Sequence, residues 1–266
     1  MQAKDAEISE SNRQYVTMWK VLSGDRPGAD LSDRPGLSMC WADCAFPFWN
    51  AIFVTERHAG PELLSSRLRE SVAYMNQKQH SGLVYVCEDF LDAAARQNLD
   101  TLARHAGLAF MMDIDGMAAD IPHEGALPET PLAFTRVTDE AALLTYGEIN
   151  AQGYGFAPEA GRAGLAGSVF WKSTAYSFIG HEDGQAVSTA AAIVNEGALY
   201  VALVATRPQA QCKGYGLATV RHALQQAGQA TGLTRAVLHA SPAGFPLYLR
   251  AGFHRTTRFL TYRLAD

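Results

Sequence analysis

Cysteine is scarce in this sequence, and the cysteines that occur are not paired. The 266 residues include Cys40, Cys44, Cys87 and Cys212, and no two of them have the CxxC spacing. The sequence therefore indicates neither a zinc site nor a disulfide framework, and we expect no metal. Most of these thiols should be buried. Cys212 stands in a glycine-rich segment, where we expect a bystander rather than a nucleophile.

An excess of basic residues and a long apolar run are also missing. Lys and Arg number 22 against 27 Asp and Glu, and the resulting net charge of −5 gives no general affinity for nucleic acid. The N-terminal stretch MQAKDAEISESNRQ lacks the apolar core of a signal peptide, and no other stretch is long and apolar enough to cross a bilayer. We therefore expect a cytoplasmic protein whose partners include neither nucleic acid nor membrane.

The length and composition favour a globular protein of two domains. Hydrophobic residues make up 48% of the chain and charged residues 18%. At 266 residues the chain exceeds the usual size of one domain. Residues 114–131 have little periodicity and hold Gly116, Pro122, Gly125, Pro128 and Pro131, which is the composition of a connection. The predicted domains are residues 1–120 and residues 131–266.

The most informative segment is QCKGYG at residues 211–216. An apolar, strand-forming run at 198–205 precedes it, and residues 217–232 follow with helical spacing of their apolar residues. A glycine loop between a strand and a helix start brings backbone N–H groups and the helix dipole toward a ligand, which makes an anion site. Lys213 adds a positive charge, and no carboxylate lies between Ala205 and Asp266 to oppose it. The alternative is that the glycines only form a tight turn.

The surrounding sequence predicts an alternation of strands and helices. In the second half, strands are expected at 132–137, 174–181, 187–195 and 235–240, and a helix is expected from Thr138 to about Gln152. Asp183 and Gly184 fit the turn between two of these strands. In the first half, helices are expected at 11–22, after Pro61 and at about 91–102, with strands at 37–42, 49–55, 83–87 and 108–112.

The second half resembles the GNAT superfamily of N-acetyltransferases. The acetyl-CoA loop of that family has Gln or Arg, two residues, Gly, one residue, then Gly or Ala, and Gln211, Gly214 and Gly216 match it. A later family motif has Leu-Tyr, three residues, then Gly-Phe, and residues 247–253 match it. The resemblance covers the chain from Leu132 onward. It implies an α/β (α+β) fold whose mixed, mostly antiparallel central sheet is flanked by helices.

The resemblance also implies where acetyl-CoA would bind. The diphosphate would lie on backbone amides of the glycine loop, and the pantetheine arm would pair like an extra strand beside residues 204–206. Ser241 stands where the family has Asn, and its hydroxyl can bond the pantetheine arm with fewer donors. The predicted cofactor-binding residues are Val204, Ala205, Thr206, Gln211, Cys212, Lys213, Gly214, Tyr215, Gly216, Leu217, Ala218 and Ser241.

The implied reaction is direct attack of an amine on the thioester. A backbone N–H of Val204 or Ala205 would stabilise the charge that develops on the carbonyl oxygen. Tyr248 stands at the family's general-acid position, where its phenol could protonate the departing thiolate, although a packing role is the alternative. The base stays unassigned between Glu148 and His239. The acceptor, a small molecule or a peptide amine, would meet the aromatic, glycine-rich residues 146–156, which an ordinary helix end also explains.

The first half has a similar plan but a different loop. At the position that corresponds to QCKGYG it carries CEDFLD, with Glu88, Asp89 and Asp92 expected in the first turn of a helix. Carboxylates at the positive end of a helix would repel a diphosphate. We therefore expect a second, degenerate GNAT-like unit that does not bind the cofactor. Its expected role is to cover the other half, to shape the acceptor pocket or to form an interface, for example in a homodimer.

Three alternatives to an acetyltransferase stay open at this point. The chain could be a non-catalytic acetyl-CoA-binding or interaction module. It could also transfer another acyl or an aminoacyl group. A nicotinamide-binding Rossmann enzyme is the weakest alternative, because GYGLAT lacks the third glycine and no acidic ribose partner follows at the required distance.

Overall fold

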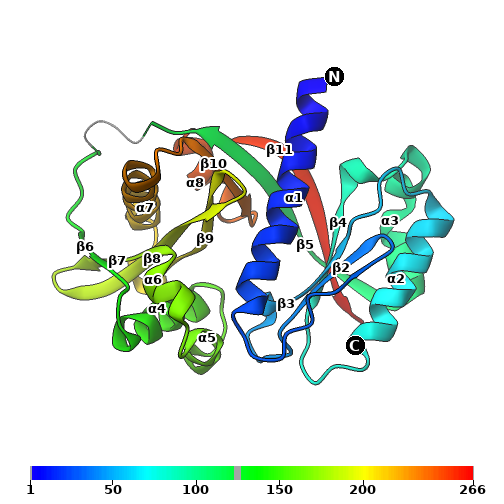
Figure 1. The fold of residues 1–266 in the computed structure, drawn as a ribbon, viewed down its shortest axis with the longest axis horizontal. Coiled ribbons are helices and arrows are strands. Elements are labelled where there is room, and N and C mark those ends of the chain that lie inside the picture. Colours follow the sequence, from blue (N-terminus) through cyan, green and yellow to red (C-terminus); the bar gives the residue numbers. More distant parts are fainter. Residues whose placement is uncertain (1, 123–126, 266) are drawn as a thin grey trace. The chain divides into compact units, whose positions relative to one another are not determined.

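The computed structural model describes residues 2–122 and 127–265, and it divides the chain into two compact units (Figure 1). Unit 1 comprises Met1–Met117, His239–Phe245 and Arg255–Asp266, and unit 2 comprises Ala118–Leu238 and Pro246–His254. The predicted domains were residues 1–120 and 131–266, and two segments of the second range, His239–Phe245 and Arg255–Asp266, belong to unit 1. Of the predicted connection, Gly125 lies outside the described residues.

Helices and strands occur in both units. The α-helices are α1 Gln2–Gly24, α2 Pro61–Met75, α3 Ala93–Ala106, α4 Glu140–Gly153, α5 Pro158–Leu165, α6 Val169–Ser173, α7 Tyr215–Thr231 and α8 Phe245–Arg250. The 3-10 turns are η1 Pro47–Trp49, η2 Glu88–Phe90 and η3 Pro208–Ala210. The strands are β1 Asp33–Arg34, β2 Leu37–Trp41, β3 Asn50–Val54, β4 Leu83–Cys87, β5 Leu108–Asp120, β6 Ala133–Arg136, β7 Tyr176–Glu182, β8 Gln185–Asn195, β9 Ala198–Thr206, β10 Arg235–Ala240 and β11 His254–Leu264.

Unit 1 is built on strands in the order β1-β2-β3-β4-β11-β5. Strand β3 runs parallel to β4, while β2 pairs antiparallel with β3 and β11 pairs antiparallel with β4. Helices α2 and α3 bury Leu64, Leu68 and Leu99 in one core with Val84 and Val86 of β4. The length of α3 is set locally, because the Asp92 side chain caps its N-terminus and the left-handed Gly107 ends it.

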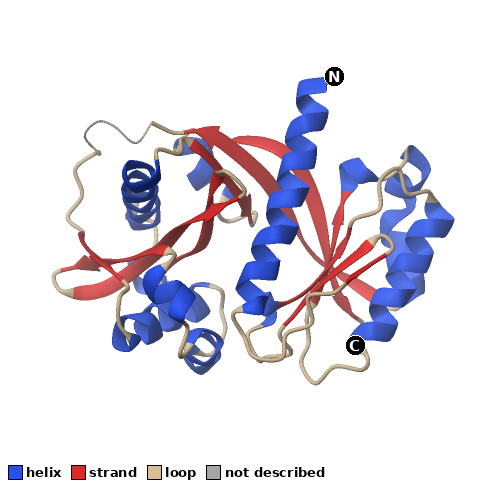
Figure 2. Ribbon diagram, viewed as in Figure 1, coloured by secondary structure: helices blue, strands red, loops and turns tan. Residues whose placement is uncertain are grey.

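Unit 2 is built on strands in the order β10-β9-β8-β7-β6. The pairs β6/β7, β7/β8 and β8/β9 are antiparallel, and β10 runs parallel to β9. Helix α7 lies on one side of these strands and α4 and α5 lie on the other (Figures 1 and 2). Small residues make this close packing possible, since Ala190, Ala191 and Ala192 of β8 are fully buried. The architecture confirms the predicted mixed, mostly antiparallel sheet flanked by helices.

Most of the predicted elements are present, two expectations were wrong, and one strand was not expected. Residues 114–120 are not part of a connection but continue β5. Glu88 and Asp89 do not lie in the first turn of α3, because they form the separate 3-10 turn η2 and α3 begins at Ala93. The sequence also gave no expectation for β11 at residues 254–264. Within the described ranges, no helix is both long and apolar enough to span a membrane.

Candidate active site

The glycine loop of unit 2 forms the predicted strand, turn and helix start. After β9 and η3, the chain takes positive φ at Cys212 (64°) and at Gly214 (82°), where glycine carries no steric penalty. Gly214 is the N-cap residue of α7, and no side chain caps this end. The first helical bond runs from the Ala218 N–H to the Gly214 carbonyl at 3.1 Å, so the N–H groups of residues 215–217 precede the regular helical ladder. This arrangement suits an anion.

Gly216 brings the start of α7 close to two neighbouring side chains. A Cβ at this position would lie 3.2 Å from the Thr206 Oγ1 and 3.3 Å from a methyl carbon of Leu247. Because residue 216 is a glycine, the start of α7 packs closely against the end of β9. The Gln211 side chain donates to the Thr206 carbonyl at 3.2 Å, which closes the loop from the other side.

The charge at this loop differs from the prediction, because Lys213 is opposed by a carboxylate. Glu182, at the end of β7, lies 3.1 Å from the Lys213 ammonium and also accepts a hydrogen bond from the Tyr215 hydroxyl. The two hydrogen bonds, that of Tyr215 first, lower the pKa of Glu182, and the carboxylate raises the pKa of Tyr215 to about 12. The expectation of an unopposed lysine was therefore wrong, since the partner comes from outside the segment that was searched.

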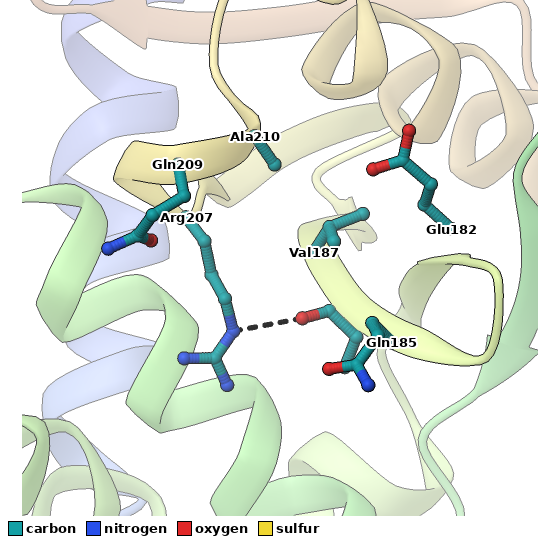
Figure 3. A pocket seen from close by; sticks show the side chains of 7 residues that line it. Glu182, Gln185, Val187, Arg207, Gln209 and Ala210 are labelled. Carbon is teal, nitrogen blue, oxygen red and sulfur yellow. Dashed lines mark hydrogen bonds between the residues drawn. The ribbon is translucent and has the colours of Figure 1, made fainter.

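Among the described residues of unit 2, two cavities adjoin the loop. One, of about 230 Å³, is lined by Lys213, Gly214, Leu217 and Arg221 together with residues 127–131. The other, of about 500 Å³, lies between η3 and the β7–β8 turn, where Arg207 reaches across to the Ala186 carbonyl at 2.9 Å (Figure 3). The Arg207 guanidinium also donates to Gln152 and, at 3.0 Å, to Glu148. The cavity beside Lys213 is the better extension of the anion site, because the N-cap residue Gly214 and a second cation, Arg221, also line it.

Strand β9 contains a bulge just before the loop. The register with β8 shifts between Thr189 and Ala191, and Leu203 has a φ of 46°, which is uncommon for a residue with a side chain. The Leu203 carbonyl accepts hydrogen bonds from the Tyr146 hydroxyl at 3.1 Å and the Thr189 hydroxyl at 3.2 Å. The Val204 carbonyl accepts one from the Tyr154 hydroxyl at 3.1 Å. The expected acceptor segment, residues 146–156, thus contacts the strand expected to hold the pantetheine.

The other edge of β9 is open over the same residues. Strand β10 pairs with β9 only at Leu199 and Tyr200, so residues 201–206 have no β10 partner in the described part of the chain. An open strand edge can accept an extended ligand through main-chain hydrogen bonds.

Tyr248 lies in unit 2 on the short helix α8 and is buried, with 8% of its surface exposed. Its ring makes an edge contact with Phe253, at 5.9 Å between ring centroids, and its hydroxyl has no hydrogen-bond partner among the described residues. Burial, with a smaller effect from Tyr154, raises the pKa of Tyr248 well above its usual value. Burial, with smaller effects from Tyr154 and Tyr248, also raises the pKa of Tyr146 well above its usual value. Three protonated phenols therefore gather near the β9 bulge.

The two candidate bases are both engaged elsewhere. Glu148 binds two guanidiniums, that of Arg162 at 2.8 Å and that of Arg207 at 3.0 Å. His239 belongs to unit 1, where it stacks on Tyr15 with 3.6 Å between ring centroids and contacts the Ser11 hydroxyl at 3.1 Å. Burial lowers the pKa of His239 well below its usual value, so the ring is neutral at physiological pH.

The predicted cofactor-binding residues fall into two groups. Residues 204–206 and 211–218 lie together in unit 2, on β9, the loop and the first turn of α7, and Gln211, Cys212 and Lys213 are exposed. Ser241 belongs to unit 1, where its hydroxyl accepts a hydrogen bond from the Gly244 N–H at 3.3 Å.

Two residues that shape this site were not predicted: Glu182 and Thr189, which lie on the β7–β8 hairpin. Asn150 and Tyr154 lie within the expected acceptor segment 146–156, but their contacts with β8 and β9 were not predicted. A local signal existed only for Thr189, because the polar pair Ser188 and Thr189 interrupts an apolar strand and both side chains are fully buried.

Unit 1 has no comparable anion loop at its corresponding turn. Glu88 pairs with Arg258 at 2.6 Å and Asp89 with Arg96 at 3.0 Å, while the Asp92 carboxylate accepts from the Ala95 N–H at 2.7 Å. Carboxylates thus occupy the positions at which an anion would bind. Across the described residues of both units, no group of three or more His, Cys, Asp or Glu side chains could hold a metal ion.

Comparisons with known proteins agree with this geometry. Residues 149–253 match the family described as Acetyltransferase (GNAT) family. No curated protein matches the chain. Among solved structures, a GCN5-related N-acetyltransferase from Kribbella flavida has a TM-score of 0.69 at 15% identity, and the match covers 97% of this chain and 95% of that one.

Two further structures show the same fold. A GCN5-related N-acetyltransferase from Sphaerobacter thermophilus has a TM-score of 0.58 at 17% identity over 80% of this chain and 71% of that one. A GCN5-related N-acetyltransferase-like protein from Streptococcus suis has a TM-score of 0.56 at 14% identity over 96% and 98%. The glycine loop and the Leu-Tyr and Gly-Phe motif both lie within residues 149–253, the part of the chain that matches the GNAT acetyltransferase family.

Proposed function

We propose that this protein transfers an acetyl group from acetyl-CoA to an amine by direct attack. The observation that carries the proposal is the continuity of three features in unit 2: an open edge on β9, an uncapped helix start directly after it, and a buried phenol whose hydroxyl has no partner within the described residues. A thioester with a diphosphate at one end fits this order. The family match at residues 149–253 alone supports only acyl transfer.

The diphosphate of CoA would bind the N–H groups of residues 215–217, with Lys213 at the side. Gly214 supplies the left-handed turn that exposes these groups, and Gly216 admits no larger side chain without displacing Thr206 or Leu247. The ADP end would extend into the cavity beside Lys213, where Arg221 is a second cation. The pantetheine arm would lie along the open edge of β9 at residues 204–206.

The acetyl carbonyl would then lie beside the bulge. The Leu203 carbonyl points toward Tyr146 and Thr189, and the Val204 carbonyl points toward Tyr154. Both peptide bonds are trans, so the N–H groups of Val204 and Ala205 point away from those tyrosines. Either N–H could stabilise the charge on the thioester oxygen as the amine attacks carbon.

Tyr248 would protonate the thiolate that leaves. As the C–N bond forms and the C–S bond breaks, the electron pair passes to sulfur, and the Tyr248 hydroxyl supplies the proton. The raised pKa keeps this phenol protonated before the reaction, and the same buried surroundings also raise the basicity of the thiolate that it must protonate. We assign neither Glu148 nor His239 as the base, because both side chains are held by other groups.

The decisive variant is Tyr248→Phe. Free thiol release would be followed over a panel of small amines and peptide N-termini, first with acetyl-CoA and then with longer acyl-CoAs. We expect kcat to fall roughly 10²- to 10⁴-fold while the dissociation constant of acetyl-CoA changes less than twofold. A wild-type protein that binds acetyl-CoA but releases no thiol with any amine would be a binding module. If thiol is released faster with a longer acyl-CoA than with acetyl-CoA, the transferred group is that longer acyl group rather than acetyl.

A further inference from the structure

The β9 bulge is held in an unfavourable backbone conformation by side chains that no sequence motif marks. Leu203 has a φ of 46°, a region that costs free energy for any residue with a Cβ and persists only where the surroundings enforce it. The register shift against β8 occurs at the same place. The contacts of the Leu203 carbonyl therefore decide whether the bulge keeps this shape.

Two buried donors hold that carbonyl. The Tyr146 hydroxyl donates to it at 3.1 Å and the Thr189 hydroxyl at 3.2 Å. Both side chains are fully buried. Burial raises the pKa of Tyr146 far above neutrality, so its hydroxyl remains a donor at every pH at which the protein would be assayed.

Asn150 fixes the direction in which the Thr189 hydroxyl donates. Its amide nitrogen donates to the Thr189 Oγ1 at 2.9 Å and to the Tyr146 carbonyl at 3.0 Å. A threonine hydroxyl has one proton, so an oxygen that accepts from Asn150 is left to donate toward Leu203. Asn150 is also fully buried, and the three side chains form one hydrogen-bonded chain between α4, β8 and β9.

The orientation of the Val204 N–H follows from these hydrogen bonds. In a trans peptide the N–H points opposite to the carbonyl, so a Leu203 carbonyl fixed toward Tyr146 and Thr189 fixes the Val204 N–H in the other direction. That peptide lies within residues 201–206, which have no β10 partner in the part of the chain that the structure describes.

We propose that Asn150, Thr189 and Tyr146 are positioning residues that hold the β9 bulge so that the Val204 N–H binds the acetyl carbonyl oxygen. The inference rests on the proposed function and adds to it the groups that aim the donor. It also favours Val204 over Ala205 as the N–H that stabilises the developing charge. These side chains act through the backbone and do not touch the substrate themselves.

The test compares Thr189→Val, which removes the hydroxyl at nearly constant volume, with Thr189→Ser, which retains it. Loss of one oxyanion donor costs about 10²- to 10³-fold in kcat, so a misdirected donor should cost at least about tenfold. We expect Thr189→Val to lower kcat at least tenfold with the KM for acetyl-CoA within twofold of wild type. Thr189→Ser should retain most of kcat, and Tyr146→Phe should resemble Thr189→Val.

The matched control is Ser177→Ala on β7. Ser177 is fully buried, and its hydroxyl has no partner within the described residues, so its removal deletes a buried hydroxyl without affecting the bulge. We expect wild-type kcat for this variant. Equal kcat values for Thr189→Val, Thr189→Ser and Ser177→Ala, or a KM effect alone, would overturn the inference.

A second readout does not depend on turnover. In amide NMR spectra of the full chain, the Val204 N–H should differ in chemical shift between the complexes with acetyl-CoA and with CoA, and Thr189→Val should remove that difference. If wild type has no turnover but shows this difference, the inference stands and the proposed transfer fails. If wild type has turnover and Val204 does not respond, the proposed function stands and the inference fails. If acetyl-CoA does not bind, both fail.

Discussion

Helices α4 and α5 meet through two glycines, and the substitution Gly161→Ala tests this contact. A Cβ at Gly161 would overlap the Gly147 carbonyl oxygen, lie 2.7 Å from its carbonyl carbon and lie 2.8 Å from the Ala151 Cβ. In the reverse direction, a Cβ at Gly147 would lie 2.5 Å from the Gly161 carbonyl oxygen. Backbone faces backbone here, so no side-chain rotation can relieve the overlap and the helices must separate.

Two opposite effects decide the size of the change. Replacing glycine by alanine within a helix gains up to about 1 kcal/mol from propensity. Overpacking against rigid neighbours costs about 1–3 kcal/mol and occasionally more. Since the overlap is with main chain, we expect the second effect to win, with a net loss of about 1–2 kcal/mol and a fall in Tm of roughly 2–8 °C for a chain of this size.

Thermal unfolding followed by circular dichroism measures this loss. The control is Ala163→Gly at an exposed position of the same helix, which should lose up to about 1 kcal/mol through propensity alone. A Gly161→Ala protein that is more stable than wild type would show that the helices do not touch as described. Because α4 carries Tyr146 and Asn150, the same variant should also lower kcat.

Two further predictions concern charge. Replacing Glu182 with Gln removes the carboxylate that binds Lys213 and the Tyr215 hydroxyl, so both can bind the diphosphate. Calorimetry should then find acetyl-CoA bound roughly twofold to fivefold more tightly at low salt, and added salt should reduce this gain. Glu159→Gln on α5 is the control, and unchanged or weaker acetyl-CoA binding by Glu182→Gln would contradict the reasoning. The second prediction concerns His239, which is neutral in the folded protein because burial lowers its pKa, whereas the unfolded chain binds a proton near pH 6.5. The stability that it contributes is complete above about pH 6.5 and is lost as the pH falls, by up to about 1.4 kcal/mol per unit. Urea midpoints for His239→Gln should therefore vary less than those of wild type between pH 6.5 and 5, and parallel profiles would rule this out.

The elements that the sequence predicted best are those whose pattern is local. The bounds of β4 and β10 agree with the expected 83–87 and 235–240, because each is a short apolar run with clear turn residues around it. Strand β11 was missed because its polar residues, such as Thr256, Thr257 and Thr261, are buried only through their strand partners. The continuation of β5 through Gly116 was missed for a similar reason, since the glycine there meets Ser11 and Thr256 of other segments.

The candidate site divides in the same way. The glycine loop and Tyr248 carry motifs with fixed spacing, so their residues could be named from the sequence. The Leu203 bulge could not be predicted, because ALYVALVA has the pattern of a regular strand. The bulge depends on the hydroxyls of Thr189 and Tyr146, which lie 14 and 57 residues away in the sequence. The partner of Lys213 was missed because Glu182 lies 31 residues earlier, and only the β7–β8 hairpin brings it to the loop.

The central claim is that the start of α7 binds the diphosphate of a CoA thioester, and titration calorimetry of the full chain with acetyl-CoA tests it most directly. The account predicts saturable heat with a dissociation constant between about 1 µM and 1 mM. It also predicts weaker binding for Gly216→Val, whose larger side chain would displace Thr206 or Leu247. The absence of heat at millimolar acetyl-CoA, or equal binding by folded Gly216→Val, would contradict it.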